Sequence, residues 1–264
     1  AALPEAGSYI ARTAALRPIL VVRGNDGVVR GFRNACRHRG MPVAEGNGCT
    51  RAFNCPYHSW SYGLNGKLKF IPGEEGFPDF DKAENGLVPV TAEEKNGIVF
   101  VTQDEPISTG AFDEAPEVIY PDQELFDIAE FDDKANWKLL CETSMEGYHI
   151  KALHNRTFYP YGFDNLNIVE SYGPNSRIVF PFRRIEKLRN IPPAERRIDG
   201  MVTSAYQLFP NTHISVLSSH SLFIVMEPIS RSETKWIIYR LGNRRGKGEG
   251  VEEKLKEAKR DAKF

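Results

Sequence analysis

The chain has 264 residues, of which 41% are hydrophobic and 26% charged, and its formal net charge is −1. These values are typical of a globular protein large enough for two hydrophobic cores. A net charge near zero argues against a nucleic-acid partner held by phosphate contacts and against a polybasic membrane anchor. No apolar run approaches the length of a membrane span, and residues 1–8 lack the regions of a signal peptide.

The first part of the chain, residues 1–104, is predicted to be all-β. The sequences Gly24-Asn25-Asp26-Gly27 and Asn65-Gly66 are typical of hairpin turns, and an apolar run lies on each side of both. We expect five short strands in this part, at residues 19–23, 28–33, 60–64, 67–71 and 97–101.

The second part, residues 105–264, is predicted to be α+β. Residues 104–122 hold three prolines and several acidic residues and indicate a linker. A helical pattern follows, in which four residues recur on one face at the helical period: Trp137, Leu140, Cys141 and Tyr148. Six later segments predict an antiparallel sheet: 168–172, 177–182, 205–208, 213–218, 222–227 and 235–241. The charged residues 251–264 favour a final helix.

The number and positions of the cysteines argue against a disulfide-stabilised protein and for a metal-binding one. The four cysteines, Cys36, Cys49, Cys55 and Cys141, are too few for a disulfide scaffold in a chain of this size. Two of them stand close to histidines, which indicates metal binding in a reducing compartment such as the cytoplasm. Cys49 is interpreted as a small loop residue.

The strongest pattern is Cys36-x-His38 together with Cys55-x-x-His58. Two cysteines and two histidines can bind either zinc or a two-iron cluster. Zinc fingers usually group like ligands, whereas each segment here supplies one thiolate and one imidazole. This alternation favours a [2Fe–2S] cluster with cysteines on one iron and histidines on the other. Neutral imidazoles raise the reduction potential of such a cluster above that of an all-cysteine cluster.

These segments resemble a known family. Cys36-Arg37-His38-Arg39-Gly40 and the run from Cys55 to Gly63 are similar to the cluster loops of Rieske-type aromatic-ring-hydroxylating oxygenase α subunits, although Ser59 replaces the glycine of most members. The resemblance implies an all-β Rieske [2Fe–2S] domain followed by a helix-grip catalytic domain of antiparallel sheet and helices. It also implies that both domains are cut short at the ends of the chain.

The segment 136–154 resembles the iron-binding helix of the same family, which implies that His149 and His154 bind a mononuclear iron. Two histidines and a carboxylate form a facial triad with open positions for O₂ and substrate. On an ideal helix, however, residues five apart lie about 140° apart around the axis. The two histidines can therefore share a metal only if the helix distorts or ends between them.

Other candidate residues follow from the resemblance with less support from the residues themselves. Glu146 stands where the family has an acidic residue that links an iron histidine to a cluster histidine of a neighbouring subunit. Glu142 could lie beside the iron or face solvent. The third ligand, a carboxylate, is expected beyond Phe264, because Asp261 lacks the expected context. His213 and His220 are either ordinary sheet or pocket residues or substrate contacts.

The function implied is that of a terminal oxygenase component. Electrons from NAD(P)H would reach the cluster through a separate reductase, with or without a ferredoxin, and pass to Fe(II), where O₂ is activated. The substrate would be an aromatic or other small organic molecule that is hydroxylated, dihydroxylated or demethylated. The resemblance further implies a homotrimer, with or without β subunits. A Rieske electron carrier and a zinc-stabilised binding module remain as alternatives, and the His149–His154 pair argues against the carrier.

Overall fold

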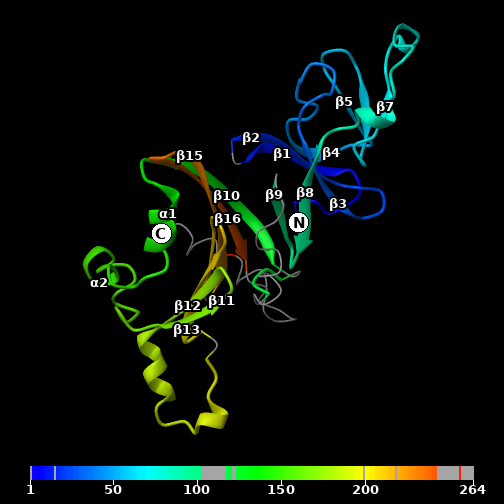
Figure 1. Cartoon of the computed structure of the whole chain (residues 1–264). Coiled ribbons are helices and arrows are strands. Elements are labelled where there is room, and N and C mark those ends of the chain that lie inside the picture. The colour runs from blue at the N-terminus through cyan, green and yellow to red at the C-terminus, as the bar shows by residue number, and fades with distance from the viewer. Residues whose placement is uncertain are drawn as a thin grey trace. The chain divides into compact units, whose positions relative to one another are not determined.

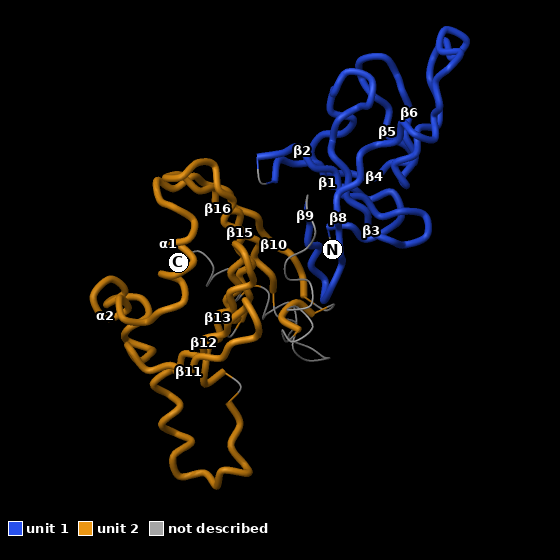
Figure 2. Tube along the Cα trace, viewed as in Figure 1, with its two compact units in different colours: residues 1–107 blue, residues 108–264 orange. Residues whose placement is uncertain are grey.

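The computed structural model describes residues 2–14, 16–102, 117–120, 123–198, 200–217, 219–242 and 256. The chain divides into two compact units, residues 1–107 and 108–264 (Figures 1 and 2). The expected boundary between residues 104 and 105 lies outside the described residues, as do most of the linker and all but one residue of the tail at 251–264. None of the helices in the described part is long and apolar enough to cross a membrane.

The first unit contains two antiparallel sheets. The six-stranded sheet has the order β4-β1-β2-β3-β8-β9 and the three-stranded sheet the order β5-β6-β7. The strands are β1 (Ser8–Ala14), β2 (Arg17–Arg23), β3 (Val29–Arg33), β4 (Gly46–Cys49), β5 (Ala52–Asn54), β6 (Ser61–Gly63), β7 (Leu68–Phe70), β8 (Pro89–Lys95) and β9 (Ile98–Thr102). Two 3₁₀ turns, η1 (Glu74–Gly76) and η2 (Ala83–Asn85), separate β7 from β8.

Both predicted hairpins of this unit are present. Strands β2 and β3 pair from Ile19↔Arg33 to Arg23↔Val29, and β6 turns into β7 at Asn65-Gly66. Gly66 has a φ of 77°, which favours glycine, and its α-carbon lies so close to the Phe32 ring that a β-carbon would clash. The turn is therefore packed directly onto the core of the unit, where Tyr62 is fully buried.

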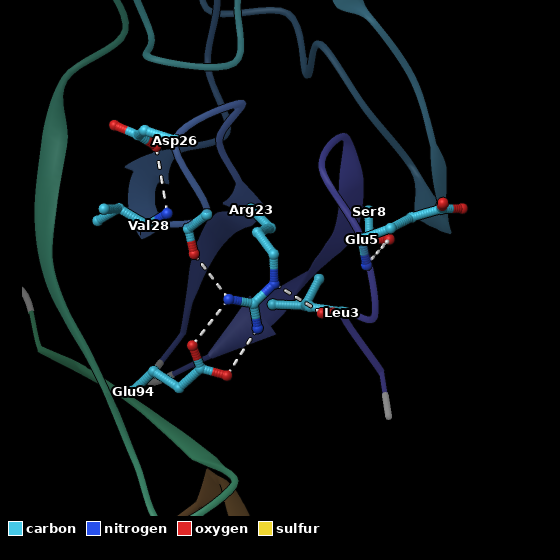
Figure 3. A network of polar contacts seen from close by, with 8 residues as sticks. Leu3, Glu5, Ser8, Arg23, Asp26, Val28 and Glu94 are labelled. Atoms are coloured by element: carbon cyan, nitrogen blue, oxygen red, sulfur yellow. Dashed lines mark hydrogen bonds and ion pairs between the residues drawn. The ribbon is translucent and has the colours of Figure 1, made fainter.

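Arg23, at the end of β2, ties three segments of the first unit together (Figure 3). Its guanidinium donates to the carbonyl oxygens of Leu3 and Gly27, each at 2.8 Å, and to both carboxylate oxygens of Glu94 on β8, at 2.6 and 2.9 Å. The hydrogen bonds from Arg23 hold the pKa of Glu94 below its usual value. A planar guanidinium can satisfy such a divergent set of acceptors because its donors point in fixed directions.

The second unit is built on a seven-stranded antiparallel sheet with the order β10-β16-β15-β14-β13-β12-β11. This confirms the predicted antiparallel sheet, to which the structure adds the edge strand β10. The strands are β10 (Glu124–Asp133), β11 (Ile168–Tyr172), β12 (Asn175–Pro181), β13 (Val202–Leu208), β14 (Thr212–Val216), β15 (His220–Ser230) and β16 (Glu233–Gly242). Two 3₁₀ segments, η4 (Arg183–Leu188) and η5 (Pro193–Glu195), lie between β12 and β13.

Helices α1 (Trp137–Thr143) and α2 (Ile150–Leu153) lie on one side of this sheet (Figure 1). Helix α1 begins at Asn136, whose side chain accepts a hydrogen bond from the Lys138 amide at 2.9 Å. Its Cys141 is buried against Ile224 and Met226 of β15. The predicted apolar face of the helix is thus confirmed for its first two turns.

The predicted face is wrong at Tyr148, which is 80% exposed. Helix α1 ends at Thr143, so Tyr148 is not on the same helix as Cys141. The sequence did not predict this end of the helix. Met145 and Ile150 are apolar, as residues on the buried face of a longer helix would also be. The end of α1 at Thr143 therefore sets where the following residues, Glu146 and His149 among them, are placed.

Candidate metal centres

The first Cys/His loop, residues 36–41, follows β3. The Cys36 amide donates to the carbonyl of Met41, and the Gly40 amide donates to the carbonyl of Cys36, both at 2.8 Å. The loop is therefore closed on itself by its own backbone. This leaves the side chains of Cys36 and His38 to project from a defined turn.

The second loop, residues 55–60, joins β5 to β6 and repeats this geometry. The Cys55 amide donates to the carbonyl of Trp60 at 2.8 Å, and the Ser59 amide donates to the carbonyl of Cys55 at 2.9 Å. The spacing of both bonds matches that of the first loop. Each loop thus presents one cysteine and one histidine from the same kind of turn, although the histidine is two residues after Cys36 and three after Cys55.

The two loops bring their four predicted site residues together. Cys36 and Cys55 are buried free thiols that interact with each other. The rings of His38 and His58 have centroids 4.7 Å apart. Two imidazoles that bind one metal through nitrogen atoms at about 2.1 Å have centroids roughly 4.6–5.3 Å apart. The histidine pair therefore fits two ligands of one iron.

A second observation supports this fit. Nδ1 of His38 is buried and has no hydrogen-bond partner among the described residues. A buried polar atom without a partner is costly unless something binds it. Burial, followed by the nearby His58 and Arg39, lowers the pKa of His38 and so favours the neutral imidazole, which is the form that binds metals.

Aromatic side chains surround this site. The Tyr62 hydroxyl accepts a hydrogen bond from the Arg37 amide at 3.0 Å, which leaves its own proton for Sγ of Cys36, 3.2 Å away. Burial raises the pKa of both Tyr62 and Cys36. The buried Trp60 stacks on the His38 ring at 4.9 Å and shields that side of the site from water.

The second candidate centre is formed by the residues at the two ends of α2. His149 stands directly before α2, and His154 directly after it. Their ring centroids are 5.2 Å apart, again in the range of two ligands of one metal. The objection from an ideal helix does not apply, because α2 ends at Leu153 and the backbone of His154, with φ −104° and ψ 33°, is no longer helical.

Gly147 allows the turn before α2 to approach the sheet. A β-carbon at Gly147 would lie 3.1 Å from the ring of Phe180 on β12 and 3.6 Å from the Ile150 side chain. Any larger residue would push the turn away from the sheet or displace Phe180. The position of the histidine pair over the sheet thus depends on a glycine two residues before His149.

Glu146 orients His149. One carboxylate oxygen contacts Nδ1 of the His149 ring, and the other accepts hydrogen bonds from the amides of Tyr148 and His149. Burial alone would raise the pKa of Glu146, but these hydrogen bonds bring it below its usual value. With Nδ1 engaged by a carboxylate, Nε2 of His149 remains for a metal. Of the bridge that the resemblance implies for Glu146, the structure shows this half.

The remaining predicted residues are not gathered at this centre. Glu142 is exposed on α1, and Asp261 lies outside the described residues. Within the part of the chain that is described, no group of three or more His, Cys, Asp or Glu side chains could hold a single metal ion, whereas the cluster site described above needs only two ligands for each of its irons. The structure does not test the expected third iron ligand, which stays a prediction.

His213 and His220 are both buried in the sheet, on β14 and β15. The sequence left the role of these two histidines open. It did not single out Gln207, which is paired with His213 between β13 and β14. Gln207 had one signal in the sequence. It is an amide side chain between the two hydrophobic residues Tyr206 and Leu208.

Comparisons with known proteins show which families the two parts of the chain match. Residues 2–81 match the family described as the Rieske [2Fe-2S] domain, and residues 126–262 match the ring hydroxylating alpha subunit (catalytic domain). The second match covers about half of the chain. Together they confirm the expected fold of a mostly β first domain followed by an α+β catalytic domain.

Two of the curated relatives are oxygenase subunits of monooxygenases. The chain is 33% identical over 159 residues to the glycine betaine monooxygenase oxygenase subunit of Chromohalobacter salexigens, over 58% of this chain and 36% of that protein. It is 35% identical over 162 residues to the carnitine monooxygenase oxygenase subunit of Escherichia coli K12, over 58% and 43%. The chain thus spans about two fifths of the length of these curated relatives.

Solved structures share the fold. A quaternary ammonium Rieske monooxygenase in complex with L-carnitine superposes with a TM-score of 0.77 at 24% identity, over 98% of this chain and 71% of that one. At this identity the likeness shows the fold alone.

Proposed function

The chain belongs to the ring-hydroxylating α subunit family, and from this premise we propose that it is the terminal oxygenase component of a Rieske-type oxygenase system. The observation that carries the proposal is the 5.2 Å separation of the His149 and His154 ring centroids. Glu146 contacts Nδ1 of His149. An electron carrier needs the Cys/His loops of the first unit but has no use for this second histidine pair.

The cofactors of the protein are a Rieske [2Fe–2S] cluster and a mononuclear iron, with O₂ as co-substrate. We propose Cys36, Cys55, His38 and His58 as the cluster ligands. We propose His149 and His154 as iron ligands. When bound, the cluster supplies one-electron transfer and the iron supplies O₂ activation.

The chain's own residues prepare these centres. Tyr62 donates a hydrogen bond to the Cys36 sulfur, which stabilises extra negative charge there. Trp60 covers the His38 ring and keeps water from it. Glu146 fixes the tautomer and direction of the His149 ring. The family likeness, together with its partly exposed position beside His149, supports a further role for Glu146 as the bridge to a cluster histidine of a neighbouring subunit.

We propose that residues 1–104 form the Rieske domain and residues 105–264 the catalytic domain. The likeness supports a homotrimer, with or without β subunits, in which electrons cross between neighbouring subunits of a closed ring. Electrons would come from NAD(P)H through a separate reductase, with or without a ferredoxin. The free cysteines are compatible with a cytoplasmic location.

The substrate is proposed to be a small organic molecule. Glycine betaine and carnitine appear in the names of two relatives, so demethylation of a methylated amine is one candidate reaction. Hydroxylation or dihydroxylation of an aromatic ring is another, because the same ligands serve all three reactions.

Iron content and spectroscopy test the proposal. We expect a brown protein with three irons per chain and a low-average-g EPR signal after reduction, whereas a pure carrier would hold two irons. With a reductase present, NADH and O₂ consumption should depend on a substrate from a panel of aromatics, methyl ethers and quaternary amines. A colourless protein with stoichiometric zinc would contradict the assignment.

A further inference from the structure

Buried polar atoms without partners gather on one face of the second unit. Among the described residues four buried side-chain nitrogen or oxygen atoms have no hydrogen-bond partner, and one of them is Nδ1 of His38 in the first unit. The other three are Oε1 of Gln207, Nδ1 of His213 and Nε1 of Trp236. Each such atom costs about 1–3 kcal/mol when it stays unpaired, so three in one unit indicate that something binds there.

The three residues share one face of the sheet. Gln207 pairs directly with His213 between β13 and β14, and His213 pairs with Ile224 on β15. Directly paired residues of an antiparallel sheet point to the same face. Ile224 and Met226 belong to that face, and Trp236 pairs with Met226. The side chains of Gln207 and His213 are therefore neighbours.

This is also the face that carries α1 and the histidine pair. Nε2 of Gln207 lies 3.3 Å from Sγ of Cys141 on α1, and Gly147 packs against Phe180 of β12. On β12, Ser176 pairs with Gln207. Phe180 lies four residues further along the same strand and on the same face. Four residues of a strand span about 13 Å, so the polar pair and the turn before His149 contact two ends of one stretch of this face.

The polar pair is uncharged. Burial lowers the pKa of His213 to about 4, so its imidazole is neutral at physiological pH. Its Nε2 is engaged with the Ser215 hydroxyl at 2.9 Å. Arg240 and Asp127, which are paired on this face, form an ion pair with each other. Neither Gln207 nor a neutral His213 offers an opposite charge to a ligand that brings a net charge to them.

We propose that Gln207 and His213 form the polar end of the substrate site and select an uncharged substrate whose hydroxyl or amide group both donates and accepts hydrogen bonds. The proposal rests on the proposed oxygenase function. A donor satisfies Oε1 of Gln207, and either a donor or an acceptor satisfies Nδ1 of His213, according to its tautomer. If the Gln207 amide is turned over, its nitrogen is unpartnered instead, and the same kind of group still satisfies it.

This chemistry separates the chain from relatives named for quaternary ammonium compounds. A trimethylammonium group has neither an N–H donor nor a lone pair, so it cannot satisfy Gln207 or His213. A carboxylate can accept from a donor but cannot donate to Oε1, and it carries a charge. We therefore expect phenols, alcohols or amides to be preferred.

Ligand binding to the full chain tests the inference without turnover. In ligand-observed NMR titrations, phenol and benzamide should bind, and benzoate and glycine betaine should bind at least about tenfold more weakly. Gln207→Leu and His213→Phe should each weaken phenol binding about tenfold. The matched control is Ser204→Ala, on the opposite face of β13, which should bind phenol as the unmodified chain does.

Stability provides the second readout. If the two side chains serve a ligand, Gln207→Leu removes an unpaired buried atom and should raise the melting temperature of the ligand-free protein by about 2–4 °C. A purely structural role predicts a lower melting temperature with phenol binding unchanged, and that result would overturn the inference. Failure of phenol and benzamide to bind the unmodified chain would overturn it too. Iron content and EPR of the same preparation report separately on the proposed function.

Discussion

Gly40 and Ser59 occupy the same position in the two Cys/His loops, and both have a left-handed backbone, with φ angles of 74° and 58°. Each donates its amide hydrogen to the carbonyl of the cysteine four residues earlier. A side chain costs about 1–2 kcal/mol in this region of the backbone because its β-carbon crowds the carbonyl oxygen. Ser59 therefore carries a strain that Gly40 does not.

We predict that Ser59→Gly stabilises the protein by about 0.5–1 kcal/mol, which corresponds to roughly 1–4 °C in melting temperature. Gly40→Ser is the matched opposite change. Nothing lies within 4 Å of a β-carbon at Gly40, so the substitution should destabilise the protein through the backbone conformation alone. It should lower the melting temperature by a similar amount. Equal melting temperatures for Ser59→Gly and the unmodified protein would show that Ser59 is not strained.

A second prediction concerns the reduction potential of the cluster. Tyr62→Phe removes the hydroxyl 3.2 Å from Sγ of Cys36, and with it a hydrogen bond of about 1 kcal/mol that is stronger to the reduced, more negative cluster. For a one-electron couple this corresponds to a potential lower by roughly 40 mV. Redox titration followed by EPR measures the shift. Tyr9→Phe, in the same hydrophobic core, should leave the potential unchanged. A potential that does not fall in Tyr62→Phe would contradict the role of this hydroxyl.

The third prediction concerns the iron ligands. His149→Ala and His154→Ala should each abolish substrate oxygenation, because each removes one of the two imidazoles, 5.2 Å apart between centroids, that are proposed to bind the iron. The visible and EPR spectra of the cluster should persist, since its proposed ligands belong to the other unit. Lys151→Ala, on the exposed surface of α2 between the two histidines, is the control and should remain active. Turnover retained in either histidine variant would exclude the pair as iron ligands.

The fourth prediction separates two roles of Glu146. Glu146→Gln keeps the size of the side chain but removes its charge, so it should slow electron transfer from cluster to iron more than it weakens iron binding. Single-turnover kinetics can follow this: the cluster is reduced first, substrate and O₂ are added, and cluster reoxidation is recorded. Unchanged reoxidation, or full activity in a monomer by light scattering, would show that no bridge between subunits operates.

Short sequence motifs predicted the turns and loops whose conformation depends on residues close together in the chain. The two hairpins followed from Asn65-Gly66 and from the turn at residues 24–27, because these residues adopt backbone angles that others avoid. The cluster loops were equally visible, since a cysteine and a histidine at short spacing are rarely combined by chance. In the second unit, apolar alternation predicted the central strands, whose neighbours on both sides bury them.

Features that depend on partners distant in sequence could not be predicted in this way. Strand β4 reads Gly46-Asn47-Gly48-Cys49 and has no apolar pattern, and it is a strand because it pairs with β1. The end of α1 had no capping signal in the sequence. The neighbourhood of Gln207 and His213 comes from the register of two strands, which single residues do not encode.

The Arg23 contacts have a consequence for how the first unit opens. Leu3, the turn at Gly27 and strand β8 at Glu94 are held by one guanidinium, although they are far apart along the chain. Local opening of any one of them removes bonds that restrain the others. In native-state hydrogen exchange, amides in these three segments should therefore exchange with a common opening free energy, as one cooperative unit. Arg23→Lys, which cannot span all three acceptors, should divide that unit into segments that exchange independently.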